Sequence, residues 1–85
     1  MNNYIAELKY MSNENYELPS HLEEFKMSAK NMDAAINVFR NKLSIHMSDK
    51  EDYYIESGFD YENHSEISFS DVETGQDVCY SISIA

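Results

Sequence analysis

Five stretches of the chain alternate between apolar and polar residues, which is the period of a β-strand with one face buried. They cover residues 4–10, 22–29, 53–62, 66–70 and 78–84. Gly58 interrupts the third stretch and indicates a bulge or a bend. Polar residues that favour turns separate the stretches. We expect a loop at 12–20, which holds the only proline, and a hairpin loop at 71–77, which contains Gly75.

Between the second and third stretches, the spacing of apolar residues changes from two to about 3.6, the period of an amphipathic helix. Asn31 precedes this segment and suits a helix N-cap, because its side-chain oxygen can accept from an unpaired amide of the first turn. Asp33 lies in that turn, where the helix dipole favours a negative charge. The pattern predicts a helix over residues 32–46, with an apolar stripe made of Met32, Ala35, Ile36, Phe39, Leu43 and Met47.

This order of strands and helix predicts an α+β fold. A single helix can cover only one face of a sheet, and antiparallel sheets commonly keep their other face in water. A chain of 85 residues has the length of one domain. We therefore expect residues 1–85 to form a single α+β domain, with one helix packed on a four- to five-stranded antiparallel sheet in the order β-β-α-β-β-β.

Charge is distributed unevenly along the chain. Residues 1–50 contain 7 acidic and 6 basic residues, a net charge of −1. Residues 51–85 contain 9 acidic residues and no Lys or Arg, a net charge of −9. This acidic part is also rich in aromatic and aliphatic residues, unlike a disordered acidic tail. We therefore expect its carboxylates to be displayed on a folded surface.

That surface is predicted to bind a partner through acidic residues and one tyrosine. Alternate residues of a strand lie about 6.6 Å apart on the same face, so the acids of the third stretch form a row. Acids of the next strand and of the hairpin loop extend it. An exposed tyrosine adds contact area, as tyrosines do at interfaces generally. The predicted contacts are Tyr54, Glu56, Asp60, Glu62, Glu66, Asp71, Glu73 and Asp77.

A concentrated negative surface repels nucleic acid and anionic lipid, and it attracts basic surfaces. Regularly spaced carboxylates can also occupy a groove in which Lys and Arg otherwise meet phosphates. The alternative explanation is solubility, since acidic surfaces keep small proteins soluble without any specific partner. Charge placement therefore favours a protein partner and disfavours direct binding of nucleic acid or membrane.

The sequence contains no pattern that favours catalysis, a cofactor or a metal ion. Its three histidines do not have metal-ligand spacing. A calcium loop starting at Asp71 would need Gly at its sixth position and an acid at its twelfth, where Gln76 and Ile82 stand. Cys79 is the only cysteine and is expected to be a small buried apolar residue. One helix leaves little room for a catalytic pocket, so we expect no enzyme.

A strand that ends at residues 25–29 (Phe-Lys-Met-Ser-Ala) leads into a helix start at residues 31–35 (Asn-Met-Asp-Ala-Ala), and a meander follows. In a very small acidic chain, this arrangement resembles the small phage-encoded anti-CRISPR proteins, several of which are DNA mimics. The resemblance covers most of the chain in size, order of elements and charge. It implies binding to a Cas protein or surveillance complex, at the surface that recognises target DNA.

We therefore expect a non-enzymatic inhibitor that binds a basic, nucleic-acid-binding protein surface and needs no cofactor. The alternatives are an immunity, antitoxin-like or adaptor protein with another basic partner, an acidic domain without nucleic-acid mimicry, and a small enzyme or ligand-binding domain with a sizeable pocket. A homodimer formed through an exposed edge strand at 78–84 is a further alternative. The chain has no signal-peptide pattern and no apolar stretch of about 18 residues, so we expect a cytoplasmic location, in the host cytosol if a phage encodes it.

Overall fold

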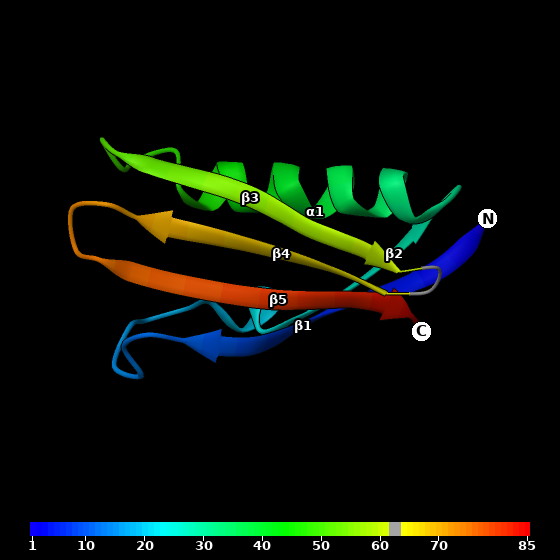
Figure 1. The fold of residues 1–85 in the computed structure, drawn as a ribbon, viewed down its shortest axis with the longest axis horizontal. Coiled ribbons are helices and arrows are strands. Elements are labelled where there is room, and N and C mark those ends of the chain that lie inside the picture. Colours follow the sequence, from blue (N-terminus) through cyan, green and yellow to red (C-terminus); the bar gives the residue numbers. More distant parts are fainter. Residues whose placement is uncertain (62–63) are drawn as a thin grey trace.

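The computed structural model describes residues 1–61 and 64–85, and the side chains of all of these except 58–61. A single helix packs against a five-stranded antiparallel sheet, which confirms the predicted α+β fold (Figure 1). The elements along the chain are β1 (Asn2–Met11), a short 3-10 helix η1 (Ser20–Leu22), β2 (Glu24–Ala29), α1 (Met32–His46), β3 (Tyr53–Tyr61), β4 (His64–Asp71) and β5 (Gln76–Ile84).

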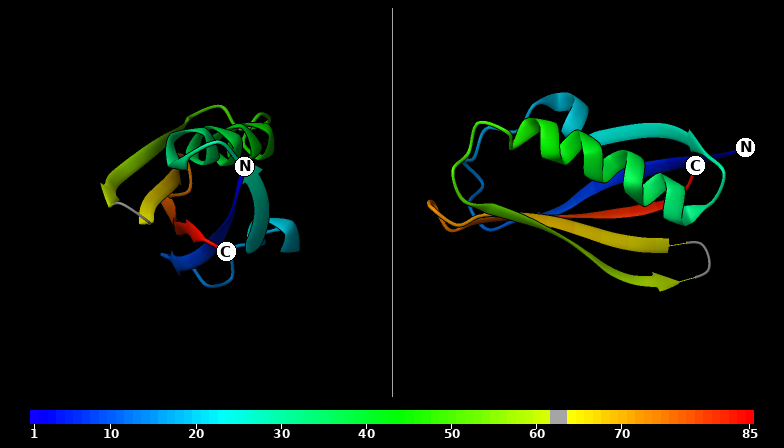
Figure 2. Two further views of the ribbon diagram at one scale, coloured as in Figure 1. Left: turned by 90° about the vertical axis from the view of Figure 1, so that its right-hand side faces the viewer. Right: turned by 90° about the horizontal axis from the view of Figure 1, so that it is seen from above.

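The strands lie in the order β2-β1-β5-β4-β3, and each is antiparallel to its neighbours. α1 runs along one face, and the sheet curls around it (Figure 2). β5 lies between β1 and β4, so the prediction of an exposed edge at residues 78–84 is wrong. The free edges of the sheet belong to β2 and β3, and a strand-paired homodimer would have to use one of them.

α1 has the predicted bounds and the predicted cap. The Asn31 side-chain oxygen accepts from the backbone N–H of Ala34 at 2.9 Å, which pairs an amide that the helix itself cannot pair. The apolar stripe of α1 faces the sheet, and Phe39 at its centre is fully buried. Its ring lies edge-on to the ring of Tyr80 in β5, with 4.7 Å between centroids. The other buried residues of the stripe are Ala35, Ile36 and Leu43, with Met47 just beyond the helix.

The strands complete the core with alternate residues, as their sequence pattern predicts. The buried apolar residues of the sheet are Tyr4, Ala6, Met27, Ala29, Ile67, Phe69, Val78, Tyr80 and Ile82. Phe25 and Ile55, on the edge strands, pack against this core while remaining partly exposed. All of these side chains lie on the helix side, so the residues between them point to the opposite face.

Two irregularities in strand pairing change which face a residue occupies. The alternation of residues 4–10 predicts that Tyr10 lies on the buried face. In β1, however, the pairing with β5 shifts between Leu8 and Tyr10, so Tyr10 lies opposite Cys79 and is 57% exposed. In β3, the pairing with β4 shifts between Ser57 and Asp60, which is where Gly58 predicted a bulge.

The loop between β1 and β2 closes one end of the core. Leu22, predicted to begin the second strand, lies instead in η1 and is buried. Tyr16 of the same loop places its ring 6.4 Å from that of Phe69 and its hydroxyl 3.4 Å from Nε2 of His46. These contacts attach the loop to the C-terminal end of α1.

The Tyr80 hydroxyl is buried and has no hydrogen-bond partner among the described residues. Burial raises the pKa of Tyr80 well above its usual range, because the phenolate could not be solvated there. An unsatisfied buried polar group costs about 1–3 kcal/mol. We therefore expect Tyr80→Phe to raise the free energy of unfolding by up to about 1 kcal/mol, measured by urea titration.

Tyr4→Phe is the matched control for this measurement. Tyr4 is also buried, but its hydroxyl accepts from Nδ2 of Asn2 at 3.4 Å, so its removal should bring no gain in stability. A Tyr80→Phe chain that unfolds at lower urea than the unchanged protein would show that the hydroxyl has a partner in solution.

Candidate protein-interaction face

The face of the sheet turned away from α1, here called the open face, carries four of the eight sequence-predicted contacts. Strand alternation and register place polar or small side chains on it from all five strands. Each of these strands contributes one described acidic residue, and the central positions are occupied mainly by serines. The described members are Glu24, Lys26, Ser28, Asn3, Ile5, Glu7, Tyr10, Asp77, Cys79, Ser81, Ser83, His64, Glu66, Ser68, Ser70, Tyr54 and Glu56.

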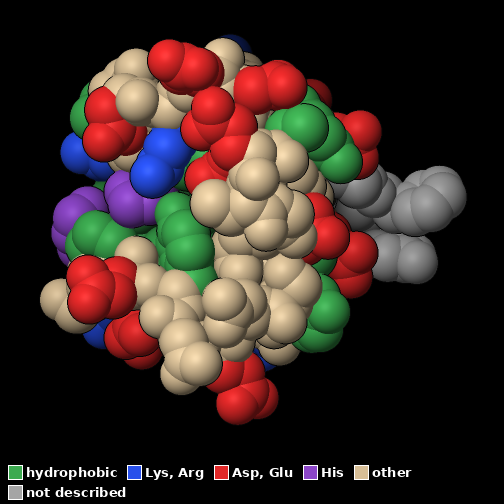
Figure 3. All heavy atoms as spheres, turned by 90° about the vertical axis from the view of Figure 1, so that its left-hand side faces the viewer, with side chains coloured by type: hydrophobic (Ala, Val, Ile, Leu, Met, Phe, Trp, Pro, Cys, Tyr) green, Lys and Arg blue, Asp and Glu red, His purple; other side chains and the backbone are tan. Residues whose placement is uncertain are grey.

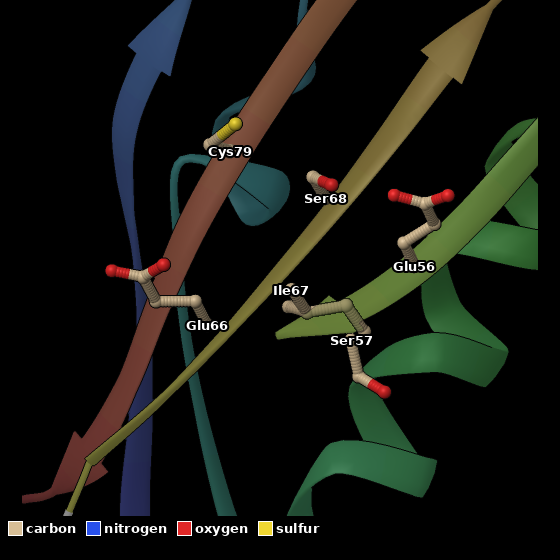
Figure 4. A pocket seen from close by; sticks show the side chains of 6 residues that line it. All are labelled: Glu56, Ser57, Glu66, Ile67, Ser68 and Cys79. Atoms are coloured by element: carbon tan, nitrogen blue, oxygen red, sulfur yellow. The ribbon is translucent and has the colours of Figure 1, made fainter. Parts of the chain in front are cut away.

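Side-chain size varies across this face in a regular way. The central strands β4 and β5 contribute small residues, and the strands beside them contribute longer ones, such as Tyr54 and Glu56 on β3. A hollow of ≈ 130 Å³ results between β3, β4 and β5. In Figure 4, Glu56 rises from β3 and Glu66 points from β4 toward β5, with Ser68 between them. The hollow is lined by Glu56, Ser57, Glu66, Ile67, Ser68 and Cys79.

Four of the predicted contacts lie together on the open face: Tyr54, Glu56, Glu66 and Asp77. Tyr54 is 48% exposed, and the Asp77 carboxylate accepts from the Ser70 hydroxyl at 2.6 Å. Three other predicted contacts are not part of this described group. The side chain of Asp60 and the whole of Glu62 lie outside the described residues, and Glu73 is exposed in the turn between β4 and β5.

Asp71 is a correction to the predicted site. β4 extends to residue 71, so Asp71 continues the inward-facing series of Ile67 and Phe69 and is only 1% exposed. One of its carboxylate oxygens accepts from the backbone N–H of Glu73 at 3.1 Å, a contact typical of Asp at the start of a turn. Gly75 completes that turn with a positive φ of 74°. Asp71 therefore supports the hairpin and does not contribute to the exposed acidic surface.

Sequence reasoning missed two acidic members of the open face, Glu7 and Glu24. They lie directly opposite one another on β1 and β2, and Glu7 is also opposite Ser81 of β5. Ser81 in turn lies opposite Glu66. The four residues form one line across the sheet, which we call the Ser81 row: Glu66, Ser81, Glu7 and Glu24. Alternation already placed both acids at polar strand positions, but only the pairing of the first strand with the last shows this line.

Basic groups do not neutralise the open face in the described part of the chain. The one ion pair within 4.0 Å among these residues joins Nε2 of His64 to Glu66, at 3.9 Å. Lys26 is on the open face without reaching a carboxylate at that distance. Two other cations are engaged on the helix side, where Arg40 donates to Oγ of Ser57 at 2.8 Å and the Lys42 ammonium lies 5.6 Å from the Phe25 ring centre.

Acidic side chains are not confined to the open face. Figure 3 views the end of the molecule that holds the β4–β5 turn and the C-terminal end of α1, and acidic groups surround this end on several sides. The loops at this end contain Asp49, Glu51, Asp52 and Glu73, and a loop imposes no regular spacing on its side chains. The open face differs because strand pairing fixes the position of each of its described carboxylates on the sheet.

Cys79 is half-buried and lies on the open face. The sequence had predicted a small buried apolar residue. Burial raises the pKa of the Cys79 thiol, and the negative charges of Asp77 and Glu66 raise it further. The thiol therefore stays protonated to higher pH than an exposed cysteine does, which lowers its reactivity.

Comparisons with protein families, with curated proteins and with solved structures found no match to this chain. In the described part of the chain, no helix has both the length and the apolar character needed to cross a membrane. The function must therefore be argued from the geometry and charge of the open face.

The Glu7–Glu24 pair gives a stability test of this arrangement. Like charges directly opposite in a sheet are destabilising, whereas opposite charges there contribute roughly 0.2–1 kcal/mol. We expect Glu24→Lys to raise the free energy of unfolding by about this amount at low ionic strength, with a smaller gain in about 0.5 M salt. Glu17→Lys, in the exposed loop, makes the same change of charge and serves as the control. An equal gain in both variants would mean that total charge, not the pair, is responsible.

The reaction rate of the Cys79 thiol depends on the negative charges beside it on the open face. We expect its reaction with a disulfide reagent at pH 8 to be several-fold slower in the folded chain than in the chain unfolded by urea, because its pKa is raised. Glu66→Gln should accelerate the folded-state reaction, whereas Glu17→Gln should leave it unchanged. Equal rates in the folded and unfolded chains would contradict the placement of this residue.

Proposed function

We propose that this protein is a binding module without catalysis of its own, which docks its open face on a basic, nucleic-acid-binding surface of another protein. The observation that carries the proposal is the set of carboxylates from five strands on one face, with no Lys or Arg within 4.0 Å of a carboxylate among the described residues. Such a face attracts a cationic cleft at long range and can fill it after contact.

The placement of the acids across the sheet favours a surface that normally receives nucleic acid. Each strand contributes one described acid to the open face, and residues paired on adjacent strands lie about 4.8 Å apart. A groove that binds a phosphate backbone presents Lys and Arg to anions spaced along its length. The open face offers carboxylates spread over the sheet in place of such anions, with Tyr54 at 48% exposure as an aromatic contact beside them.

The resemblance to anti-CRISPR proteins favours one class of partner. On this proposal the partner is a Cas protein or complex, and the open face competes with target DNA for the positive surface that recognises it. Inhibition then requires no enzymatic step, because occupancy of the groove is sufficient. An immunity protein for a basic nuclease would bind through the same attraction between carboxylates and a positive surface, with a different partner.

The test is competition for target DNA. A panel of purified Cas effector complexes, each loaded with guide RNA, is incubated with the protein before labelled target DNA is added, and DNA binding is measured by gel mobility shift. We expect the protein to prevent DNA binding by at least one complex and to lose potency steeply as salt is raised. Glu56→Lys with Glu66→Lys should weaken inhibition at least about tenfold, or about 1.4 kcal/mol.

Glu14→Lys with Glu17→Lys is the matched control, because it makes the same change of charge in an exposed loop. It should alter inhibition by less than about twofold. If only a basic nuclease that uses no guide RNA is inhibited, the Cas assignment fails and the immunity function replaces it. If no basic nucleic-acid-binding protein is affected even at low salt, the proposal fails and the acidic surface serves solubility.

A further inference from the structure

Ser81 is unusual among the open-face residues because it is both buried and unpaired. It lies at the centre of the sheet on β5 and is only 6% exposed. Its neighbours Tyr80 and Ile82 point into the core, so its side chain points to the open face. The Ser81 hydroxyl makes no hydrogen bond in the described structure, whereas that of Ser70, on the same face, is bonded to Asp77.

The groups on either side of this hydroxyl are carboxylates. Glu66 of β4 and Glu7 of β1 lie directly opposite Ser81, one from each neighbouring strand. Adjacent strands are about 4.8 Å apart, so the backbones of the two glutamates are separated by roughly 10 Å, with Ser81 between them. Ionised carboxylates are acceptors only. The Ser81 hydroxyl is not among the fully buried atoms without a partner, which in the described structure are Nε of Arg40 and the Tyr80 hydroxyl, so it can be reached from the open face. A donor placed over Ser81 would therefore meet acceptors on both sides.

We infer that the part of the open face over Ser81, between Glu7 and Glu66, is a binding site for the guanidinium group of an arginine side chain carried by a partner protein. This inference rests on the proposed function and names the group that the open face receives. A guanidinium is a planar fork with five donors, so it can reach two separated carboxylates and the hydroxyl between them. A lysine ammonium is a compact, strongly hydrated charge and cannot span the same distance.

Neighbouring features suit the rest of an arginine side chain. The hollow of ≈ 130 Å³ lined in part by Glu66, Ser68 and Cys79 lies on the β3 side of the same row and can accept an aliphatic stem. Tyr10, 57% exposed and opposite Cys79, is an aromatic residue on the β1 side. Lys26 is one row away, opposite Ile5, and forms no ion pair within 4.0 Å among the described residues, so it leaves the site unoccupied.

The site can be tested without the natural partner, using hexaarginine and hexalysine peptides as probes. Each is titrated into isotopically labelled protein in about 0.15 M salt, and backbone amide shifts are followed by NMR. We expect hexaarginine to shift the amides of Glu7, Glu66 and Ser81 most, and hexalysine to bind at least about threefold more weakly. Dispersed amide spectra establish that each variant below is folded.

Two pairs of variants distinguish binding at this site from nonspecific attraction of the peptide to the acidic protein. Ser81→Ala removes the hydroxyl without changing charge and should weaken hexaarginine binding by roughly threefold. Ser83→Ala, two residues along the same strand and face, should leave it unchanged, because Ser83 lies opposite His64 and Ile5. Glu7→Gln with Glu66→Gln should weaken binding at least about tenfold, and Glu14→Gln with Glu17→Gln less than about twofold.

Three results would overturn the inference: largest shifts in the loops at 48–52 or 72–75, equal effects of Ser81→Ala and Ser83→Ala, or equal affinity for the two peptides. None of these would by itself overturn the proposed function, because competition with DNA could persist through other acids of the open face. Failure of the proposed function is recognised separately, when no effector complex or basic nuclease is inhibited.

Discussion

Phe39 of α1 is fully buried, and its ring meets the ring of Tyr80 edge-on in the middle of the sheet. That contact holds the helix over the central strand, and the remaining core residues close around it. Because one helix can cover only one face, the other face of the sheet must stay in water and carry polar side chains. The open face is therefore a direct consequence of a fold with a single helix. The fold requires polar side chains there but does not determine which ones.

Water-exposed strands need polar side chains, but they do not need carboxylates without counter-charges. Five described acids share the open face, none of them lies within 4.0 Å of a Lys or Arg among the described residues, and Glu7 and Glu24 stand directly opposite one another. Such pairs reduce stability in a chain that, at 85 residues, buries a limited fraction of its surface. Small residues on the same face, among them Ser68 and Cys79, leave a hollow beside Glu56 and Glu66.

Much of the architecture could be predicted because it depends on local patterns. The change of period at Met32 and the Asn31 cap marked the helix, and alternation marked the strands. The misplaced residues are those whose position depends on pairing. Tyr10 changes face through a bulge in β1, and Leu22 lies in a 3-10 helix because the loop before β2 folds back over the core. Asp71 turns inward because β4 is longer than its apolar residues indicate.

By itself, the sequence determined the class of fold, the helix with its buried stripe, and the concentration of negative charge in residues 51–85, since each follows from residue types and their spacing. Only the tertiary structure decided that β1 pairs with β5, which makes the last strand central and brings Glu7 and Glu24 from the first half of the chain beside Ser81 and Glu66 from the second. Pairing between distant strands depends on how whole faces pack, so it cannot be predicted from the local spacing of residues.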